Sequence, residues 1–275
     1  MNQLLPHKRL GTRGPWLVLL HGYMVDGGMF MAVEGAFSQH YRVLIPDLRG
    51  YGAAWSWGAP YTFQQRAADV VHLIQSVAGG ESVWVLGYSM GGVIAQVLVQ
   101  SYPDLVRGII LACTFAYKPM TTLERWQGML LPRLLKMLPP ASLANLLYPQ
   151  TFGSETFPPE VIEWYKKALQ RTRLEVLLAD AKNIFSFDGR PFLGSIRVPT
   201  LVIGGTADLI VPVHHSHFLA EKIPNAQLIL YSNAGHALIF THRRPFVRDI
   251  HRFILRASHI PDSPSRRSVL SQSLQ

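Results

Sequence analysis

A serine, an aspartate and a histidine stand where they could act together as a nucleophile, an orienting acid and a base. Ser89 lies in Gly87-Tyr88-Ser89-Met90-Gly91, which matches the pattern G-x-S-x-G. The segment Ser82–Leu86 before it is a predicted strand, and a helix is predicted from Met90 onward. A serine on such a tight turn holds its hydroxyl above the edge of a sheet, and small neighbours let the backbone turn without clashes. The pattern therefore predicts a nucleophilic Ser89.

A serine hydroxyl becomes a good nucleophile only when a base takes its proton. His236 follows a predicted strand that ends at Tyr231, and Asp208 follows the predicted strand Thr200–Ile203. Open α/β sheets build their sites beyond the carboxyl ends of the strands, so these side chains are expected to meet Ser89 there. The simpler interpretations are two helix N-caps, at Ser89 and Asp208, and an ordinary loop histidine. These three interpretations would all have to be true at once, and the placement of the three residues at strand ends would then be a coincidence.

The oxyanion of an acyl-transfer intermediate needs backbone N–H donors. One is expected from Met90, which follows the nucleophile, and the other from Tyr23, in the loop after the first main strand. His21 begins that loop and is interpreted as a structural residue that holds it in place.

Short β-branched runs alternate with helical patterns along most of the chain. This alternation predicts an α/β fold with a mainly parallel central sheet and helices on both faces. The predicted strands are Trp16–Leu20, Tyr41–Ile45, Ser82–Leu86, Arg107–Ala112, Thr200–Ile203 and Gln227–Tyr231. The predicted helices of this part are Thr62–Ala78, Met90–Tyr102, Val213–Lys222 and a last one from about Arg244.

The alternation stops between residues 116 and 196. This stretch is predicted to be an inserted helical lid, punctuated by prolines such as Pro132 and Pro149. Residues 1–115 and 197–257 would form the core domain, and 258–275 a disordered tail. The predicted lid helices are Thr122–Met137, Ala141–Leu147, Pro159–Gln170 and Arg173–Ile184.

The net charge of +9 in 275 residues raises the question of an acidic partner. Seven arginines and only two aspartates lie from Arg243 onward, so more than half of the excess is terminal. This distribution argues against a nucleic-acid binder. Arg244, Arg248, Arg252 and Arg256 recur every four residues, on one face of a predicted helix. That face is interpreted as a solvated surface, with weak contact to an anionic membrane as the alternative.

Composition limits the remaining classes. The chain is 48% hydrophobic but has no run of about 18 apolar residues, so no transmembrane helix is predicted. The first residues carry no secretory-signal pattern, and the single Cys113 fits a reducing compartment, so a cytoplasmic protein is expected. Cys113 itself is interpreted as a core residue. The cluster of His214, His215 and His217 is not expected to bind a metal. The sequence has no phosphate-binding glycine motif after a strand, so no cofactor is expected.

Five segments together resemble the α/β-hydrolase superfamily, in its lidded serine esterase and lactonase branch. They are Leu17–Tyr23, Pro46–Gly52, Leu86–Gly92, Ile203–Pro212 and Asn233–Ala237. The resemblance implies that Asp47, Arg49 and Gly50 form a structural turn. Dehalogenases and epoxide hydrolases of this superfamily have aspartate in place of Ser89. Its carbon–carbon hydrolases commonly have asparagine where this chain has Tyr88.

The sequence thus predicts a serine hydrolase that cleaves a small-molecule carboxylic ester or lactone with an apolar portion through an acyl-enzyme. The open alternatives are a carbon–carbon bond hydrolase or an acyltransferase of the same fold, a non-enzymatic ligand receptor, and a peripheral membrane lipase. Substrate identity and oligomeric state are not readable from the sequence.

Overall fold

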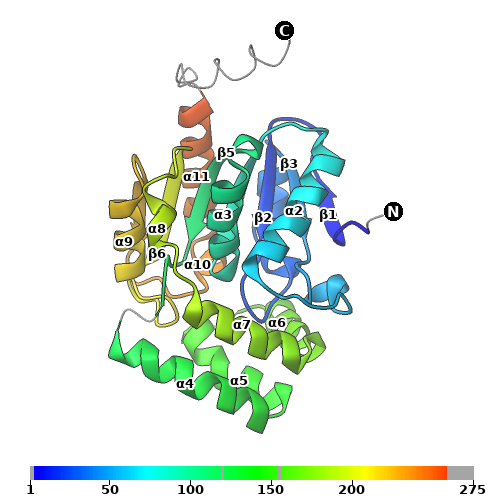
Figure 1. Cartoon of the computed structure of the whole chain (residues 1–275), viewed down its shortest axis with the longest axis vertical. Helices are drawn as coiled ribbons and strands as arrows, with labels where there is room; N and C mark the ends of the chain where they lie inside the picture. Colours follow the sequence, from blue (N-terminus) through cyan, green and yellow to red (C-terminus); the bar gives the residue numbers. More distant parts are fainter. Residues whose placement is uncertain (1–2, 119–120, 154–156, 259–275) are drawn as a thin grey trace.

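The protein has a central sheet covered by helices on both faces, with further helices packed across one end of it (Figure 1). The structure is a computed structural model that describes residues 3–118, 121–153 and 157–258. Seven strands form the sheet in the spatial order β1-β3-β2-β4-β5-β6-β7. Their bounds are β1 His7–Leu10, β2 Trp16–Leu20, β3 Arg42–Pro46, β4 Val83–Tyr88, β5 Val106–Ala112, β6 Thr200–Gly205 and β7 Gln227–Tyr231. The predicted α/β fold is confirmed.

The inner strands are parallel and buried on both faces. Every residue of β2, β4 and β6 is buried, which explains why these segments read as continuous apolar runs rather than as alternating ones. Strand β1 is the exception: it pairs antiparallel with β3 at the sheet edge, and most of its residues are exposed. The sequence analysis missed β1 because the polar sequence His7–Leu10 has no hydrophobic pattern, and only its pairing with β3 makes it a strand.

Two layers of helices cover the sheet. Helices α2 (Phe63–Ala78), α3 (Met90–Ser101) and α9 (His214–Lys222) pack into one core, and α1 (Glu34–Ser38) and α11 (Arg243–Ser258) into the other. Thr62 caps α2 by accepting the Gln65 N–H, as the sequence pattern predicts. Helix α11 turns Phe246, Ile250, Phe253 and Ile254 inward. The helix extends to Ser258, and the rest of the predicted tail lies outside the described residues.

Five helices follow one another between β5 and β6. Helices α4–α7 cross one end of the sheet, opposite the end at which α11 terminates (Figure 1). The predicted helix Ala141–Leu147 is longer in the structure, where α5 includes Pro149 and continues to Phe152. The inserted helices are α4 Thr122–Met137, α5 Pro140–Phe152, α6 Pro159–Arg171, α7 Leu174–Ser186 and α8 Arg190–Leu193.

A buried ion pair fixes the inserted helices to the core. Arg66 of α2 and Asp180 of α7 both have fully buried side chains, and two guanidinium nitrogens of Arg66 donate to the two carboxylate oxygens. The Tyr51 hydroxyl donates to the same carboxylate at 2.6 Å. Because removing one partner would leave an unpaired buried charge, this contact strongly favours one placement of α7 on the core.

None of the helices in the described part of the chain combines the length and the apolar character that crossing a bilayer requires.

Candidate active site

Ser89 occupies the turn between β4 and α3. Its backbone has φ 54° and ψ −118°, in a region that residues with a side chain rarely adopt. The side chain makes no capping hydrogen bond, although Ser89 precedes the helix directly. The simpler interpretation, an ordinary N-cap, is therefore not realised. The backbone strain is of the kind that a nucleophile at a sharp turn requires.

The two glycines around Ser89 permit close backbone approaches. A Cβ on Gly87 would lie 2.3 Å from the carbonyl oxygen of Gly91, and a Cβ on Gly91 would lie 2.1 Å from that of Leu20. Both distances are far below any real Cβ contact. The G-x-S-x-G pattern is thus a steric requirement of this turn, as the sequence analysis proposed.

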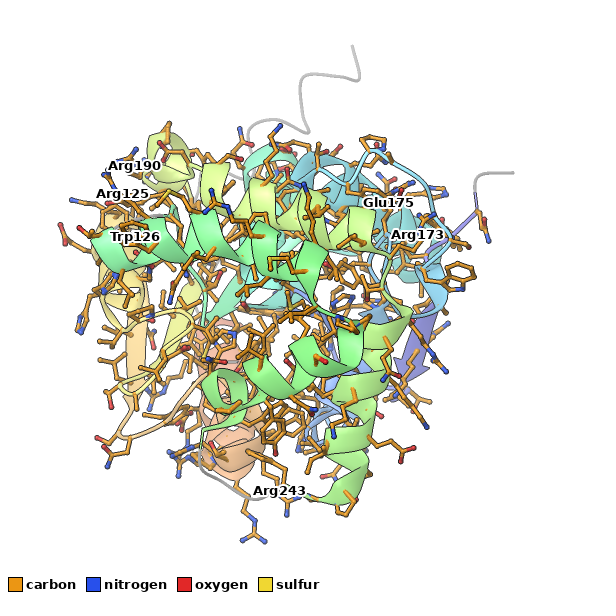
Figure 2. The ribbon with its side chains drawn as sticks, turned by 90° about the horizontal axis from the view of Figure 1, so that it is seen from below. Arg125, Trp126, Arg173, Glu175, Arg190 and Arg243 are labelled. Atoms are coloured by element: carbon orange, nitrogen blue, oxygen red, sulfur yellow. The ribbon has the colours of Figure 1, made fainter. Side chains whose placement is uncertain are left out.

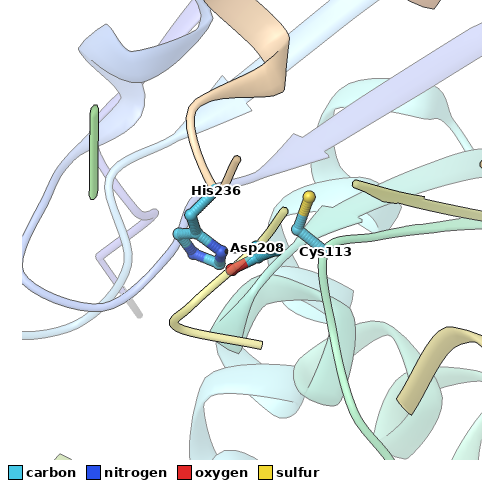
Figure 3. Close-up of side chains that lie close together, drawn as sticks. All are labelled: Cys113, Asp208 and His236. Atoms are coloured by element: carbon cyan, nitrogen blue, oxygen red, sulfur yellow. Dashed lines mark hydrogen bonds and ion pairs between the residues drawn. The ribbon is translucent and has the colours of Figure 1, made fainter. Parts of the chain in front are cut away.

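Asp208 and His236 are hydrogen-bonded to each other (Figure 3). Asp208 follows β6 and His236 follows β7, so the neighbouring strand ends bring together residues 28 positions apart. The distance from His236 Nδ1 to Asp208 Oδ2 is 2.8 Å. An ionised carboxylate can only accept hydrogen bonds, so Nδ1 carries the proton and Nε2 is free to accept one.

The second oxygen of Asp208 is engaged by the backbone. Asp208 Oδ1 accepts the N–H of Ile210 at 2.9 Å and that of Val211 at 2.8 Å. These bonds resemble a cap of the following turn, yet α9 begins only at His214. Asp208 therefore does both things that the sequence allowed: it orders its own loop and it holds the imidazole.

Ser89 and His236 line one cavity of about 350 Å³. The Ser89 hydroxyl makes no hydrogen bond within the ranges that the structure describes, and catalytic hydrogen bonds are often long without substrate. The walls are mainly apolar and come largely from the inserted helices and from the segment after His236. The larger apolar residues that these helices and the segment after His236 contribute are Leu130, Leu131, Leu134, Leu147, Phe152, Trp164, Tyr165, Ile184, Phe185, Ile239 and Phe240.

The two proposed oxyanion donors flank Ser89. Met90 is the first residue of α3, so its N–H has no intrahelical partner. Tyr23 lines the cavity, and the preceding Gly22 approaches so closely that its Cβ position lies 3.4 Å from Ser89 Cβ. The Tyr23 hydroxyl instead donates to the Leu177 carbonyl of α7 at 2.6 Å. Its side chain thus joins the loop to the inserted helices and leaves only the backbone for the oxyanion.

His21 and Asp47 hold the surrounding loops. His21 is fully buried; its Nε2 accepts the Leu48 N–H at 3.0 Å, and its Nδ1 lies 2.9 Å from the Gly22 carbonyl. Burial lowers the pKa of this imidazole, which stays neutral. Asp47 accepts the N–H groups of Gly27 and Ala53. Since backbone groups occupy both the His21 imidazole and the Asp47 carboxylate, the roles of these residues are structural, as the sequence analysis expected.

Tyr88 positions the backbone of His236. Its hydroxyl donates to the His236 carbonyl at 2.5 Å, and its side chain is buried. The sequence analysis used Tyr88 only to argue against carbon–carbon hydrolases and missed this contact. No local signal reveals it, because the two residues are 148 positions apart.

Cys113 lies beside the acid and the base. Its sulfur, a carboxylate oxygen of Asp208 and a ring nitrogen of His236 lie within 4.8 Å of one another (Figure 3). Burial, followed by the Asp208 charge, raises the pKa of the thiol well above its usual value, so Cys113 places no charge next to Asp208. Cys113 is buried as predicted, yet it follows β5, the neighbour of β6. The rule that located Asp208 at a strand end would also have found Cys113.

The histidine cluster contributes to the attachment of α4. His215 is buried and its Nε2 lies 2.5 Å from Glu124, near the start of α4. Lys118 lies 3.5 Å from the same carboxylate and donates to the Ile210 carbonyl at 2.7 Å. His214, His215 and Glu124 offer ligand atoms within 4.8 Å of one another. The cation of Lys118 and the hydrogen bond from His215 already engage the carboxylate, so we assign the group to anchoring α4 on the core.

Comparisons with known proteins agree with this architecture. The chain is 28% identical over 247 residues to a pimeloyl-[acyl-carrier protein] methyl ester esterase of Yersinia pseudotuberculosis, covering 86% of this chain and 92% of that one. It is 30% identical over 246 residues to the polyketide synthase ThaQ of Burkholderia thailandensis. The match covers 86% of this chain but only 12% of the synthase, so the chain spans a small part of that relative.

A solved structure and a family model extend the comparison. The enol-lactonase from Burkholderia xenovorans superposes with a TM-score of 0.82 at 26% identity, covering 91% of this chain and 96% of that one. The model of the alpha/beta hydrolase family matches residues 17–249. With most of its length matched and the sheet order and strand ends described above, this chain belongs to the alpha/beta hydrolase family.

Proposed function

We propose that this protein is a serine hydrolase that cleaves a carboxylic ester or lactone with an apolar acyl portion through an acyl-enzyme. The observation that carries the proposal is the Asp208–His236 hydrogen bond in a cavity that Ser89 also lines. An imidazole held as the Nδ1–H tautomer beside a serine on a strained turn is the arrangement that activates a hydroxyl.

The residues divide the reaction as follows. Ser89 Oγ attacks the carbonyl carbon while His236 Nε2 takes its proton, and Asp208 stabilises the imidazolium. The N–H groups of Met90 and Tyr23 bind the oxyanion, where the loss of one donor typically costs about 10²–10³ in rate. His236 then protonates the leaving alcohol as the tetrahedral intermediate collapses. Water, deprotonated by His236, hydrolyses the acyl-enzyme and releases the acid.

The cavity supports an apolar substrate of modest size. About 350 Å³ with mainly apolar walls suits the acyl part of an ester better than a charged or highly polar group. The relatives named as a methyl ester esterase and an enol-lactonase support the ester or lactone bond as the target. In this proposal the inserted helices act as a lid, because they supply nearly half of the residues that line the cavity over the sheet edge.

The test is hydrolysis of a panel of p-nitrophenyl esters and lactones of graded acyl length by wild type and Ser89→Ala. We expect Ser89→Ala to keep its melting temperature and to lose turnover by at least about 10⁴-fold. The matched control is Ser76→Ala, an exposed serine of α2 that should keep full activity. Undiminished turnover by Ser89→Ala would refute the mechanism.

A fluorophosphonate probe separates the enzyme from a ligand receptor of the same fold. We expect stoichiometric labelling of Ser89 in the folded wild type and none in Ser89→Ala. If wild type neither reacts with the probe nor turns over any ester, the protein is not a serine hydrolase.

A further inference from the structure

The outer face of α4 carries an unusual amount of exposed apolar surface. Leu123, Trp126 and Met137 are 66%, 57% and 77% exposed, and Met129 and Leu130 are about half exposed. Spacings of three, four and seven residues place Leu123, Trp126, Leu130 and Met137 along one side of the helix. Since a soluble surface seldom gathers so many large apolar side chains, this ridge indicates a surface with a binding role.

The exposed charges that α4 itself carries are all positive. Arg125, Arg133 and Lys136 are exposed on the same helix, next to the ridge (Figure 2 labels Arg125 and Trp126 on this face). The one acidic residue of α4, Glu124, is buried against His215 and Lys118 and does not balance them. An exposed helix face with Trp, Leu and Met beside Arg and Lys has the composition of an interfacial helix.

The ridge adjoins the cavity that holds Ser89. Leu130 belongs to both, because it is 46% exposed and also lines the cavity. Gln150 of α5 is likewise exposed and a lining residue. The cavity therefore reaches the surface between α4 and α5, beside the ridge.

Helix α11, for which the sequence analysis considered a weak membrane contact, does not have the exposed apolar surface of α4. Its apolar face is buried in the core, so it exposes arginines without an apolar ridge. It also terminates at the opposite end of the molecule from α4 (Figure 1). One flat surface cannot contact both ends, so α11 is an internal control for charge alone.

We propose that the outer face of α4 docks on an anionic lipid bilayer, with Trp126 and Leu123 in the interface and Arg125, Arg133 and Lys136 on lipid phosphates. Docking in this orientation turns the opening between α4 and α5 toward the lipid, so apolar acyl compounds reach the cavity from the bilayer. The binding step does not depend on the proposed hydrolysis and is measurable in Ser89→Ala.

The charges argue against other occupants of this face. A second copy docking face to face would bring six cations together without a facing carboxylate from α4. An acidic carrier protein would satisfy the cations, but its acidity alone gives no reason for Leu123, Trp126 and Met137 to be exposed. A bilayer offers both the anionic headgroups and the apolar interior.

The first experiment is co-sedimentation of the full chain with vesicles of phosphatidylcholine alone or with one quarter phosphatidylglycerol. We expect binding to the anionic vesicles, at least about tenfold weaker binding to the neutral ones, and weakening by added salt. Failure of wild type to bind the anionic vesicles overturns the proposal.

Charge variants test the orientation. The triple variant Arg125→Gln, Arg133→Gln and Lys136→Gln is expected to bind anionic vesicles at least about tenfold more weakly. The matched control removes the same charge from later turns of α11, toward the end that lies opposite α4: Arg248→Gln, Arg252→Gln and Arg256→Gln. Equal loss in the two triple variants would mean that net charge, not α4, governs binding, and would overturn the proposal.

Apolar variants test insertion of the ridge. Leu123→Ser with Trp126→Ser is expected to weaken binding at least about tenfold, while Tyr102→Ser with Leu255→Ser, two exposed apolar residues away from α4, leaves it unchanged. Trp126 fluorescence should shift to the blue on anionic vesicles. The proposal is overturned if the α4 pair instead dissociates a dimer in solution, or slows only the turnover of carrier-bound acyl esters without affecting vesicle binding.

Discussion

Asp208 uses its two carboxylate oxygens for different partners: Oδ2 lies 2.8 Å from His236 Nδ1, while Oδ1 accepts the backbone N–H groups of Ile210 and Val211. The division fixes the orientation of the carboxylate, because only an acceptor satisfies the two backbone donors. The same constraint determines what an amide at this position would do.

In Asp208→Asn, the amide oxygen must take the place of Oδ1 and the NH₂ group must face His236 Nδ1. The imidazole then has to accept at Nδ1 and carry its proton on Nε2, which is the wrong tautomer for a base acting on Ser89. We expect kcat for ester hydrolysis to fall by about 10⁴ with little change in melting temperature. Asp104→Asn, an exposed aspartate, is the control. Retained activity in Asp208→Asn would contradict the role of Asp208.

The strained backbone at Ser89 predicts that a glycine at this position stabilises the protein. Glycine adopts φ 54° at little cost, whereas a Cβ there is unfavourable. We expect Ser89→Gly to exceed Ser89→Ala by about 1 kcal/mol in the free energy of urea unfolding, with neither variant active. At Ser76, inside α2, the order should reverse, since glycine weakens a helix by about 1 kcal/mol relative to alanine. The same order at both positions would show that the turn is not strained.

Cys113 should be unreactive in the folded protein despite its place beside Asp208. Burial raises the pKa of the thiol, and the thiolate is the form that iodoacetamide attacks. Alkylation of the native protein near neutral pH is expected to be on the order of a hundredfold slower than in urea, with ester hydrolysis preserved. Mass spectrometry of the modified chain measures both rates. Rapid alkylation with loss of activity would indicate an exposed thiolate instead.

Stability should fall as the solution becomes acidic. Burial lowers the pKa of His21 and His215 below the usual value of 6.5. Between that value and the lower folded pKa, the unfolded chain binds protons that the folded chain does not. The free energy of unfolding is therefore highest above about pH 6.5 and declines below it, by up to roughly 1.4 kcal/mol per pH unit for each histidine.

Urea unfolding between pH 7.5 and 5 measures this slope. His215→Gln should make it shallower, because a glutamine still donates to Glu124 but does not titrate. His217→Gln, an exposed histidine of the same helix, should leave the slope unchanged. A stability that rises toward pH 5 would contradict the prediction.

Much of the fold is readable in the sequence because local patterns carry it. Strand β2 and helix α4 have the bounds that were predicted from the sequence, Trp16–Leu20 and Thr122–Met137. The G-x-S-x-G turn is equally local, since its glycines are required by backbone atoms within a few residues and by the adjacent strand. Ser89, Asp208 and His236 each follow a predicted strand of the sheet, so their common edge could be predicted from strand order alone.

Other features exist only in three dimensions. The Tyr88 contact to His236 and the Glu124–His215 contact join residues that lie 148 and 91 positions apart in the chain. No sequence pattern encodes such pairs, because each depends on how separate elements pack. Likewise the sequence identifies apolar residues in α4 but not their direction. Only the packing of α4 on the other helices determines that Leu135 faces inward while Leu123 and Trp126 face solvent. Residues that face inward form the core of the lid, whereas residues that face solvent are available to bind a partner.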